Sequence, residues 1–211
     1  MYIHKLTSQL NCFMGIMEVL KRDRKEDIFE AAVQCFNETG YYGTAIDTIA
    51  ARAKISKGGI YYHFKSKKDL FLELFTYRVN RYTDYLKNYT SDIANPEERL
   101  QVFINKASNI QKENADFFKF CIEFLSMGVR DPEIRDMMTA FYKETVGTFQ
   151  SYVDEGISMG IFKNHDSEKT ALAIYFLFMG AFFTYFSVNV EYDLIEQHAF
   201  QLNNIFKTLK H

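Results

Sequence analysis

Apolar residues recur at three- and four-residue spacing along most of this 211-residue chain, which is the spacing of one face of an α-helix. No stretch shows a convincing alternation with period two, the pattern of a half-buried strand. Two prolines, Pro96 and Pro132, and ten glycines interrupt the chain, so we expect long helices and few turns. The pattern predicts an all-α fold of about nine helices, near residues 22–39, 45–53, 57–63, 67–89, 96–113, 116–128, 132–159, 166–189 and 192–209.

Two short helices joined by a turn are expected between Thr44 and Lys68. Thr44 and Ser56 are placed to cap these helices, because a hydroxyl oxygen can accept a hydrogen bond from a backbone N–H group at a helix start. The second helix turns Ile60 and Phe64 inward. The residues left for outward or flanking positions are Lys57, Gly58, Gly59, Tyr61, Tyr62 and His63. This arrangement is typical of a helix-turn-helix, whose second helix enters the major groove of DNA.

Positive charge gathers in the same segment. Residues 52–68 contain six lysines and arginines and no aspartate or glutamate. The net charge of the whole chain is −2, but residues 21–90 carry 13 Lys/Arg against 9 Asp/Glu, and residues 91–211 carry 11 against 17. A phosphate backbone attracts a basic helix pair. The asymmetry therefore predicts a DNA-binding head joined to an acidic body with another task.

The segment resembles the DNA-binding domain of the TetR (tetracycline-repressor-like) regulators over about residues 24–75. The resemblance rests on Thr44…Ile49-Ala50…Ala53…Ile55-Ser56-Lys57-Gly58…Ile60-Tyr61-Tyr62-His63-Phe64-Lys65-Ser66-Lys67…Leu70 and, upstream, on Ile28-Phe29-Glu30-Ala31-Ala32…Phe36…Gly40-Tyr41. The chain departs from the pattern at Gly59, where many members carry a side chain. A glycine contacts a base edge only through its backbone.

The resemblance implies a role for each matching position. Positions that commonly hold the DNA backbone correspond to Thr44, Tyr62, His63 and Lys67. Positions on the recognition helix correspond to Lys57, Gly58, Gly59 and Tyr61, and the basic Lys65 completes the set of DNA-binding candidates.

The resemblance also implies a domain plan. We expect a leader at 1–20, a three-helix helix-turn-helix domain at 21–66 and an effector-binding and dimerisation domain at 67–211. In the leader, Met17 begins a stretch that resembles an alternative natural start. If the longer form is natural, residues 16–20 could extend the first helix and the basic residues 21–25 could reach DNA, and a loosely ordered or solvated leader is at least as compatible. Two copies of a short recognition helix on a twofold axis read a palindrome, so we expect a homodimer on double-stranded operator DNA.

Phenylalanine and methionine are dense between residues 100 and 155, and side chains of this kind suit either a packed core or a cavity for an apolar ligand. Our candidates for the cavity wall are Phe120, Phe124, Met127, Tyr142 and Tyr175. Glu123 is placed to meet a cationic ligand, and Lys106 or Lys119 a phosphate or carboxylate. The sequence therefore does not indicate whether the ligand is positively or negatively charged.

Residues 171–190 hold no charged side chain and meet the length of a membrane span. The run is rich in aromatic residues, and no positively charged flank orients it. A helix that is apolar all round can instead be buried twice, by its own domain and by a partner subunit. With the apolar stripe near 192–209, it predicts a four-helix dimer interface rather than a membrane helix.

Catalytic chemistry is not indicated. The five histidines are scattered, and the sequence contains no glycine-rich phosphate loop, HExxH or GxSxG motif. Cys12, Cys35 and Cys121 are odd in number and widely spaced, which argues against a disulfide framework and a zinc site. We expect no cofactor, and a reduced cytoplasm is the natural compartment.

The sequence therefore predicts a ligand-responsive DNA-binding transcription regulator, a repressor that a small hydrophobic effector releases from its operator. The alternative is a constitutive dimeric DNA-binding protein whose body only dimerises. An enzyme on a helical fold is the least favoured class.

Overall fold

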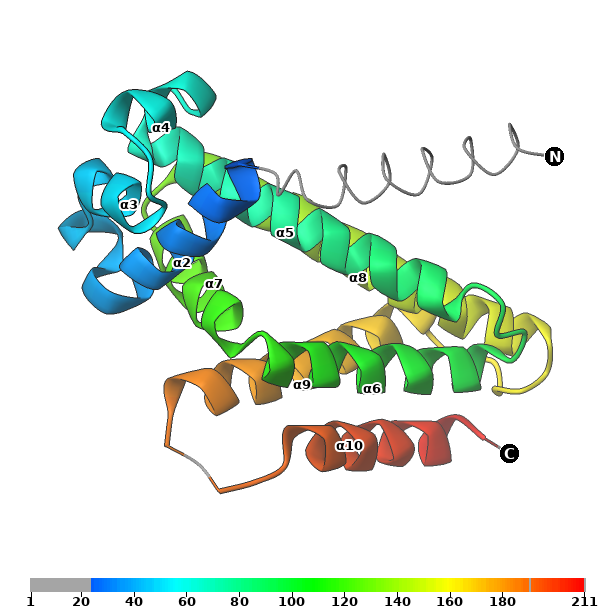
Figure 1. Ribbon diagram of the computed structural model, residues 1–211. Helices are drawn as coiled ribbons and strands as arrows, with labels where there is room; N and C mark the ends of the chain where they lie inside the picture. The colour runs from blue at the N-terminus through cyan, green and yellow to red at the C-terminus, as the bar shows by residue number, and fades with distance from the viewer. Residues whose placement is uncertain (1–23, 190, 211) are drawn as a thin grey trace, which may run out of the picture. The chain divides into compact units, whose positions relative to one another are not determined.

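The computed structural model describes residues 24–189 and 191–210. Within these ranges the chain forms nine α-helices and no strand, which confirms the all-α prediction (Figure 1). The helices are α2 (Arg24–Gly43), α3 (Ile46–Arg52), α4 (Lys57–His63), α5 (Lys67–Thr90), α6 (Pro96–Glu113), α7 (Ala115–Gly128), α8 (Pro132–Ser158), α9 (Ser167–Ser187) and α10 (Leu194–Leu209). The predicted leader at 1–20 lies outside the described residues.

Local signals account for most helix starts. Ser56 caps α4 by accepting a hydrogen bond from the Gly59 amide at 3.0 Å. Asn95 and Asp131 cap α6 and α8 in the same way, with a proline in the first turn of each helix. The cap predicted at Thr44 is wrong. Ala45 occupies the N-cap position of α3 and makes no side-chain capping bond.

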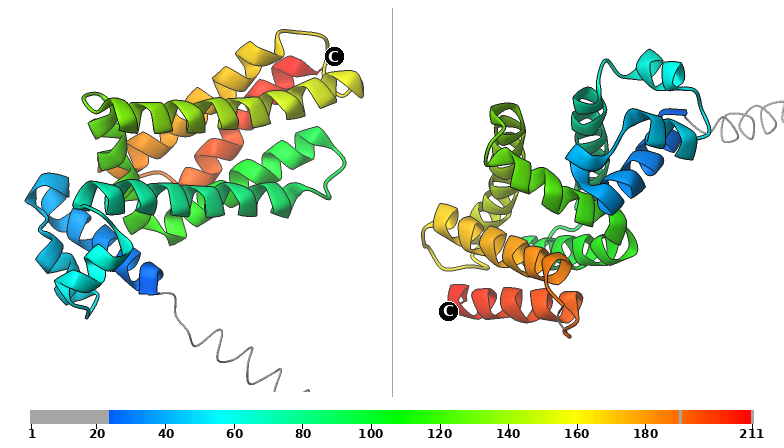
Figure 2. Two further views of the ribbon diagram at one scale, coloured as in Figure 1. Left: turned by 90° about the horizontal axis from the view of Figure 1, so that it is seen from above. Right: turned by 90° about the vertical axis from the view of Figure 1, so that its left-hand side faces the viewer.

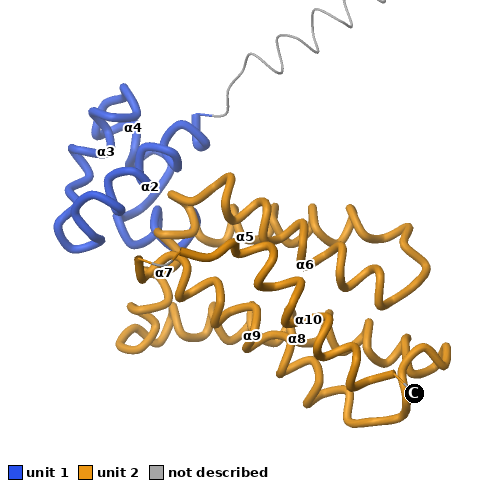
Figure 3. Tube along the Cα trace, turned by 90° about the horizontal axis from the view of Figure 1, so that it is seen from below, with its two compact units in different colours: residues 1–74 blue, residues 75–211 orange. Residues whose placement is uncertain are grey.

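The chain divides into two compact units, residues 1–74 and 75–211 (Figure 3). The division falls about two helical turns after the boundary that the sequence suggested at 66/67, because α5 begins in unit 1 and continues into unit 2. One continuous helix therefore belongs to both units.

Unit 1 packs α2, α3, α4 and the start of α5 around an aromatic core. Phe29 of α2 contacts Phe64, with ring centroids 5.6 Å apart, and Phe36 meets the edge of Phe71 at 5.1 Å. All four side chains are almost fully buried. α2 bends at Gly40, whose φ of 70° and ψ of 169° lie in a region open essentially only to glycine.

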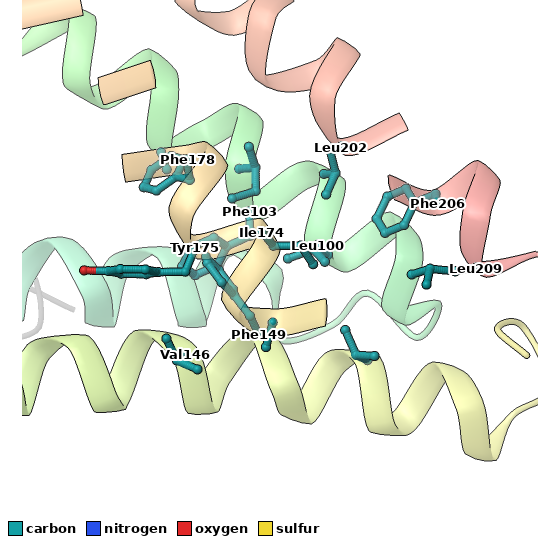
Figure 4. Close-up of a cluster of buried hydrophobic side chains, with 14 of the residues drawn as sticks. Leu100, Phe103, Val146, Phe149, Ile174, Tyr175, Phe178, Leu202, Phe206 and Leu209 are labelled. Atoms are coloured by element: carbon teal, nitrogen blue, oxygen red, sulfur yellow. The ribbon is translucent and has the colours of Figure 1, made fainter. Parts of the chain in front are cut away.

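Unit 2 is a helical bundle in which α8 packs against α6, α7 and α9, and α10 packs against α6 and α9 (Figure 2). Its main core draws side chains from α5, α6, α8, α9 and α10, and Figure 4 shows residues such as Phe103, Phe149, Ile174 and Phe206 converging there. Burial of these groups supplies the hydrophobic stabilisation of the unit. Two hollows, described below, lie among α5, α6, α7, α8 and α9.

α9 is apolar on all sides, but only part of it is buried within the chain. Phe176 and Phe183 of α9 and Phe200 of α10 are each half exposed or more. Of the described helices, α9 alone is long and apolar enough to cross a membrane. A core helix of a soluble protein meets the same criterion, so this finding is weak evidence for a span.

Candidate functional site

The α4 surface of unit 1, from Lys57 to Lys65, presents most of the predicted DNA-binding residues to solvent. Tyr62 is 85% exposed and Tyr61 is 48% exposed, and Lys57, Gly58 and Lys65 are exposed as well. Exposed tyrosine hydroxyls and lysine ammonium groups are the groups that bind phosphates. The structure therefore brings these five residues to one short helix and the residues that follow it.

Two other predicted residues lie partly inside. Gly59 faces the side chain of Ile55, and a Cβ added to Gly59 would be in ordinary contact with Ile55 at 3.5 Å. Space therefore does not require a glycine at this position. His63 is half-buried, and its ring lies edge-on to that of Tyr62, with centroids 5.1 Å apart.

Lys57 is not a free cation. Its ammonium donates to the carboxylate of Asp47 on α3 at 2.9 Å, and this contact raises the pKa of Lys57. Arg52 likewise forms a two-pronged pair with Glu38 of α2, with nitrogen–oxygen distances of 2.8 and 2.7 Å. Two of the six cations between residues 52 and 68 are thus partly neutralised by carboxylates from elsewhere in the chain.

Lys67 and Thr44 hold the end of α2 through hydrogen bonds to backbone carbonyl groups, an arrangement called the clamp below. The Lys67 ammonium donates to the carbonyl oxygens of Tyr41 at 2.6 Å and Thr44 at 2.8 Å, and it lies 4.5 Å from the centroid of the Tyr41 ring. A cation at a helix C-terminus also interacts favourably with the helix dipole. This geometry gives Lys67 a structural task that the sequence did not reveal.

The Thr44 hydroxyl is turned away from solvent. Thr44 is only 3% exposed, and its Oγ1 lies 2.7 Å from the carbonyl oxygen of Gly40 and 3.1 Å from that of Cys35. It is also 2.8 Å from the Thr39 hydroxyl. The side chain therefore satisfies carbonyl groups at the bend in α2, and its predicted contact with the DNA backbone would have to come from the main chain.

Lys65 and Ser66 immediately precede α5 and take part in capping its first turn. The Asp69 amide donates to the Ser66 hydroxyl at 3.0 Å, and the Lys65 amide donates to the Asp69 carboxylate at 2.7 Å. This reciprocal pattern resembles a capping box, which holds the chain entering a helix. The Lys65 side chain is thereby anchored at its backbone but remains in solvent, with no ion pair to any described carboxylate.

The sequence pattern did not single out two residues of unit 1, Tyr42 and Lys54, as candidates for contact with DNA. Tyr42 is 84% exposed at the end of α2, and Lys54 lies in the turn between α3 and α4 with a positive φ of 57°. A lysine rarely adopts this conformation. Tyr42 is recognised as a candidate by its exposure next to Thr44, which the sequence alone does not reveal.

The five predicted cavity-wall residues lie in unit 2, and none of them is among the residues that line the two hollows described next. Phe120 and Phe124 are fully buried, and the Phe124 ring stacks on Phe75 with centroids 3.8 Å apart. Tyr142 and Tyr175 pack edge to face at 5.1 Å beside the main core, and Met127 is half-buried. Neighbouring positions on the same helices face the cavity described next, because one residue along a helix turns the side chain by about 100°.

The apolar cavity of unit 2, with a volume of about 50 Å³, is lined by α5, α6, α7, α8 and α9. Its lining residues are Phe75, Val79, Tyr82, Gln111, Phe118, Cys121, Leu125, Met138, Phe141, Phe178, Met179 and Phe182. A larger open hollow of about 450 Å³, the α5–α7 groove, adjoins it and shares Tyr82 and Phe118 with it. The groove falls within the usual size range of small-molecule sites.

The charges at the groove differ from those proposed from sequence. Arg78, Arg81 and Asp84 line it, whereas Lys119 pairs with Asp116 at 3.6 Å. Lys106 lies above the rings of Tyr85 and Tyr89 at 5.6 and 5.1 Å. Tyr85 is itself a lining residue of the groove, so Lys106 contributes positive charge at its edge.

The described part of the chain contains no group of three or more His, Cys, Asp or Glu side chains that could hold a metal ion. Cys35 and Cys121 are buried and unpaired by disulfides, and burial raises the pKa of both thiols. Cys12 lies outside the described residues.

The match to a known family model falls within unit 1. Residues 28–74 match the family model described as bacterial regulatory proteins, tetR family. The HTH-type transcriptional regulator YerO of Bacillus subtilis is 31% identical over 132 residues, which are 62% of this chain and 44% of that protein. The matched region therefore spans less than half of that relative's length.

Solved structures share the fold over most of both chains. The regulator FadR of Bacillus subtilis, in complex with stearoyl-CoA, has a TM-score of 0.76 and 22% identity, covering 87% of this chain and 98% of that one. A regulator from Saccharomonospora viridis in complex with choline has a TM-score of 0.74 and 22% identity, covering 87% and 95%. These two ligands carry opposite charge, and at this identity the likeness establishes the fold alone.

Proposed function

Since the chain belongs to the TetR family of bacterial regulatory proteins, we propose that it represses transcription as a homodimer on palindromic operator DNA and is released by a small amphipathic effector. Its relatives are transcriptional regulators and not enzymes. The single observation that supports DNA binding most directly is the exposed α4 surface, where Tyr61, Tyr62 and Lys65 project into solvent from a capped helix.

The proposed contacts fall into three groups. The major groove would be contacted by Lys57, Gly58, Gly59 and Tyr61. Lys57 would leave its ion pair with Asp47 to bind DNA. The DNA phosphates would be bound by Tyr62, His63 and Lys65. Thr44 and Lys67 would position this surface from behind, through the clamp on α2. A fourth contact is proposed for Tyr42, because its ring is almost fully exposed.

Dimerisation is proposed through α9 and α10. Large exposed apolar side chains on a soluble protein mark a surface that another protein covers, and Phe176, Phe183 and Phe200 supply such side chains on these two helices. A twofold interface uses the same surface on both copies. Operator binding also makes the cytoplasm the compartment in which the protein would act.

Release by an effector follows from the position of α5. Phe75, Val79 and Tyr82 of this helix line the apolar cavity, and the same helix begins at Lys67, in unit 1. A ligand that favours one position of α5 would shift the population of DNA-competent dimers, by an amount set by its differential affinity for the two states.

The test begins with selection of binding sites from a random DNA library, followed by fluorescence anisotropy on the selected site at two salt concentrations. We expect one sequence-selective complex with two chains per palindrome. Lys65→Met should lower the slope of log K against log salt by about 0.9, the value for one phosphate contact. Lys143→Met, which removes an exposed charge from unit 2, is the matched control and should change neither affinity nor slope.

Each outcome has a distinct meaning. Absence of any sequence-selective complex would overturn the proposal. Selective binding that no amphipathic compound weakens would favour the alternative, a constitutive dimeric DNA-binding protein. The groove of about 450 Å³ is the observation that favours the effector-responsive form over this alternative.

A further inference from the structure

The α5–α7 groove and the apolar cavity together have the form of a site for a molecule with two unlike ends. The groove opens to solvent and carries charged side chains, whereas the cavity behind it is walled by aromatic, aliphatic and methionine side chains. Tyr82 and Phe118 belong to both hollows, and their rings meet edge to face at 5.5 Å. These two rings therefore form the neck between the charged part and the apolar part.

Two arginines and one aspartate are the charged residues that line the groove. Arg78 and Arg81 lie three residues apart on α5, so they share one face of that helix. Asp84 is the only carboxylate among the lining residues, and Lys106 adds a cation at the edge of the groove above Tyr85. This balance contrasts with the surplus of acidic residues across residues 91–211, 17 Asp/Glu against 11 Lys/Arg.

The geometry of a guanidinium suits an anion. Each arginine presents five N–H donors in a planar fork that matches the two oxygens of a carboxylate or phosphate. The Arg81 guanidinium donates to the Tyr77 hydroxyl at 2.8 Å and lies 5.3 Å from the Tyr77 ring centroid, so this arginine is held in place by a neighbour on its own helix. A fixed guanidinium loses less entropy when an anion binds.

Two buried polar groups lie at the neck or beside it, the Tyr82 hydroxyl and the Gln111 side chain, which lines the cavity. Gln111 is 2% exposed, and neither its Oε1 nor the Tyr82 hydroxyl has a hydrogen-bond partner among the described residues. Buried polar atoms without partners are uncommon in native proteins and call for an explanation. Burial raises the pKa of Tyr82, and a weaker interaction with the Gln111 side chain opposes that rise, so the two polar groups lie close to each other.

The free volume of the apolar cavity limits the size of the apolar group that can enter it. With about 50 Å³ of free volume it accepts only a few atoms without rearrangement. Met138 and Met179 stand in its wall, and methionine side chains adapt their shape more readily than other apolar groups. A longer tail would therefore have to move these side chains and the helices that carry them, α8 and α9.

We propose that the effector is an amphiphile with an anionic head and an apolar tail. Its head lies against Arg78 and Arg81, the polar atoms next to it bond to Tyr82 and Gln111 at the neck, and its tail enters the apolar cavity. A fatty acid carboxylate and an acyl-CoA phosphate offer the same chemistry to this site. The inference rests on the proposed function for its biological meaning, but its binding test needs no DNA.

The first experiment compares four heads on one tail of twelve carbons. Dodecanoate, dodecanoyl-CoA, dodecanol and dodecyltrimethylammonium are titrated into the full-length protein below their micelle concentrations, and binding is followed by calorimetry, with CoA alone as the tail-free probe. We expect the tighter of the two anionic compounds to bind at least about tenfold better than the neutral and cationic ones. The tighter of the two identifies the source of the anion. Equal affinities for all heads, preference for the ammonium head or no binding at all would overturn the inference.

The second experiment removes the proposed contacts to the head. Arg78→Ala and Arg81→Ala together should lower affinity for the tighter anion about tenfold or more and leave affinity for dodecanol unchanged. Arg130→Ala and Lys143→Ala together remove two exposed cations of unit 2 that line neither hollow, so this pair controls for net charge. Equal losses in the control pair, or no loss in the Arg78/Arg81 double variant, would contradict the assignment.

The third experiment separates a binding role from a structural one at Gln111. Gln111→Leu replaces a buried amide, whose Oε1 has no hydrogen-bond partner among the described residues, with an apolar side chain of similar volume. We expect affinity for the anionic amphiphile to fall about tenfold while the melting temperature shows that the fold is retained. Gln201→Leu alters another buried amide whose Oε1 has no partner, on α10 and away from both hollows, and should leave amphiphile affinity unchanged. Unchanged affinity in Gln111→Leu would remove this residue from the site.

These tests distinguish the inference from the function on which it rests. Anionic amphiphiles that bind a protein without operator affinity would refute the regulator and leave the site assignment standing. An operator released by a cationic or neutral compound alone would refute the site assignment and leave the regulator standing.

Discussion

Replacing Lys67 with methionine is expected to loosen the end of α2 while leaving the charge on the α4 surface intact. The ammonium donates to two carbonyl oxygens, of Tyr41 and Thr44, and lies above the Tyr41 ring. Charge-assisted bonds contribute about 1.5 kcal/mol each at the low end of their range, and the ring about 0.5 kcal/mol. The side-chain entropy of holding a lysine offsets about 1.5 kcal/mol of this. The net loss should be about 2 kcal/mol of local stability.

Amide hydrogen exchange measures this loss where it occurs, because protection in α2 and α3 reports local opening. We expect protection factors in these helices to fall by roughly 30-fold in Lys67→Met, the factor that corresponds to about 2 kcal/mol. The slope of operator affinity against salt should hardly change. Lys65→Met is the matched control and should behave in the opposite way, with unchanged exchange and a smaller slope.

The reasoning about the clamp fails if Lys67→Met leaves amide protection in α2 and α3 unchanged. A salt slope reduced by about 0.9 with unchanged protection would return Lys67 to the phosphate contacts that the sequence suggested for it. Changes in both would mean that Lys67 holds α2 and also contacts DNA.

Three further changes test the packing and protonation of the fold. Lys54→Gly should raise the free energy of unfolding by about 0.5–1 kcal/mol in urea titration, because Lys54 has a φ of 57°, and a decrease would contradict strain at this turn. Gly156→Ala should lower it by about 1–3 kcal/mol, since a Cβ there would lie 2.3 Å from the ring of buried Phe162; an unchanged value would mean that the ring moves aside freely. Burial lowers the pKa of His198, so the unfolded chain binds a proton more readily, and stability should be complete above about pH 6.5 and decline below it. Thermal unfolding between about pH 5 and 7.5 should therefore show a decline that His198→Gln lacks, and equal declines in both proteins would assign it to other groups.

Helix limits could be predicted closely where the signal lies within a few residues. Ser56, Asn95 and Asp131 each cap the helix that follows, and a proline occupies the first turn of two of these helices. Thr44 carries the same kind of signal and failed, because its hydroxyl faces carbonyl oxygens that the bend at Gly40 brings within reach. A threonine can bond forward or backward along the chain, and only the packed structure selects the direction.

The cavity wall could be predicted only as far as the helices that form it. Composition drew attention to the aromatic and methionine residues of α7, α8 and α9, and these helices do surround the cavity. The side chains that line it include Cys121 and Leu125, each one position after a predicted residue, whereas Phe124 stacks on Phe75 instead. α7 is apolar on several faces, so its periodicity does not indicate which face meets a cavity.

The sequence by itself determined the helices, the helix-turn-helix motif and the accumulation of lysine and arginine between residues 52 and 68. These properties depend on neighbours along the chain, through capping, helical periodicity and local composition. Only the tertiary structure decided which cations remain available, because ion pairs form between groups that are close in space. Glu38 engages Arg52, Asp47 engages Lys57, and the Lys67 ammonium turns inward to α2. Only the tertiary structure likewise shows that Arg78, Arg81, Tyr82 and Gln111, which belong to two helices, lie around the two adjoining hollows.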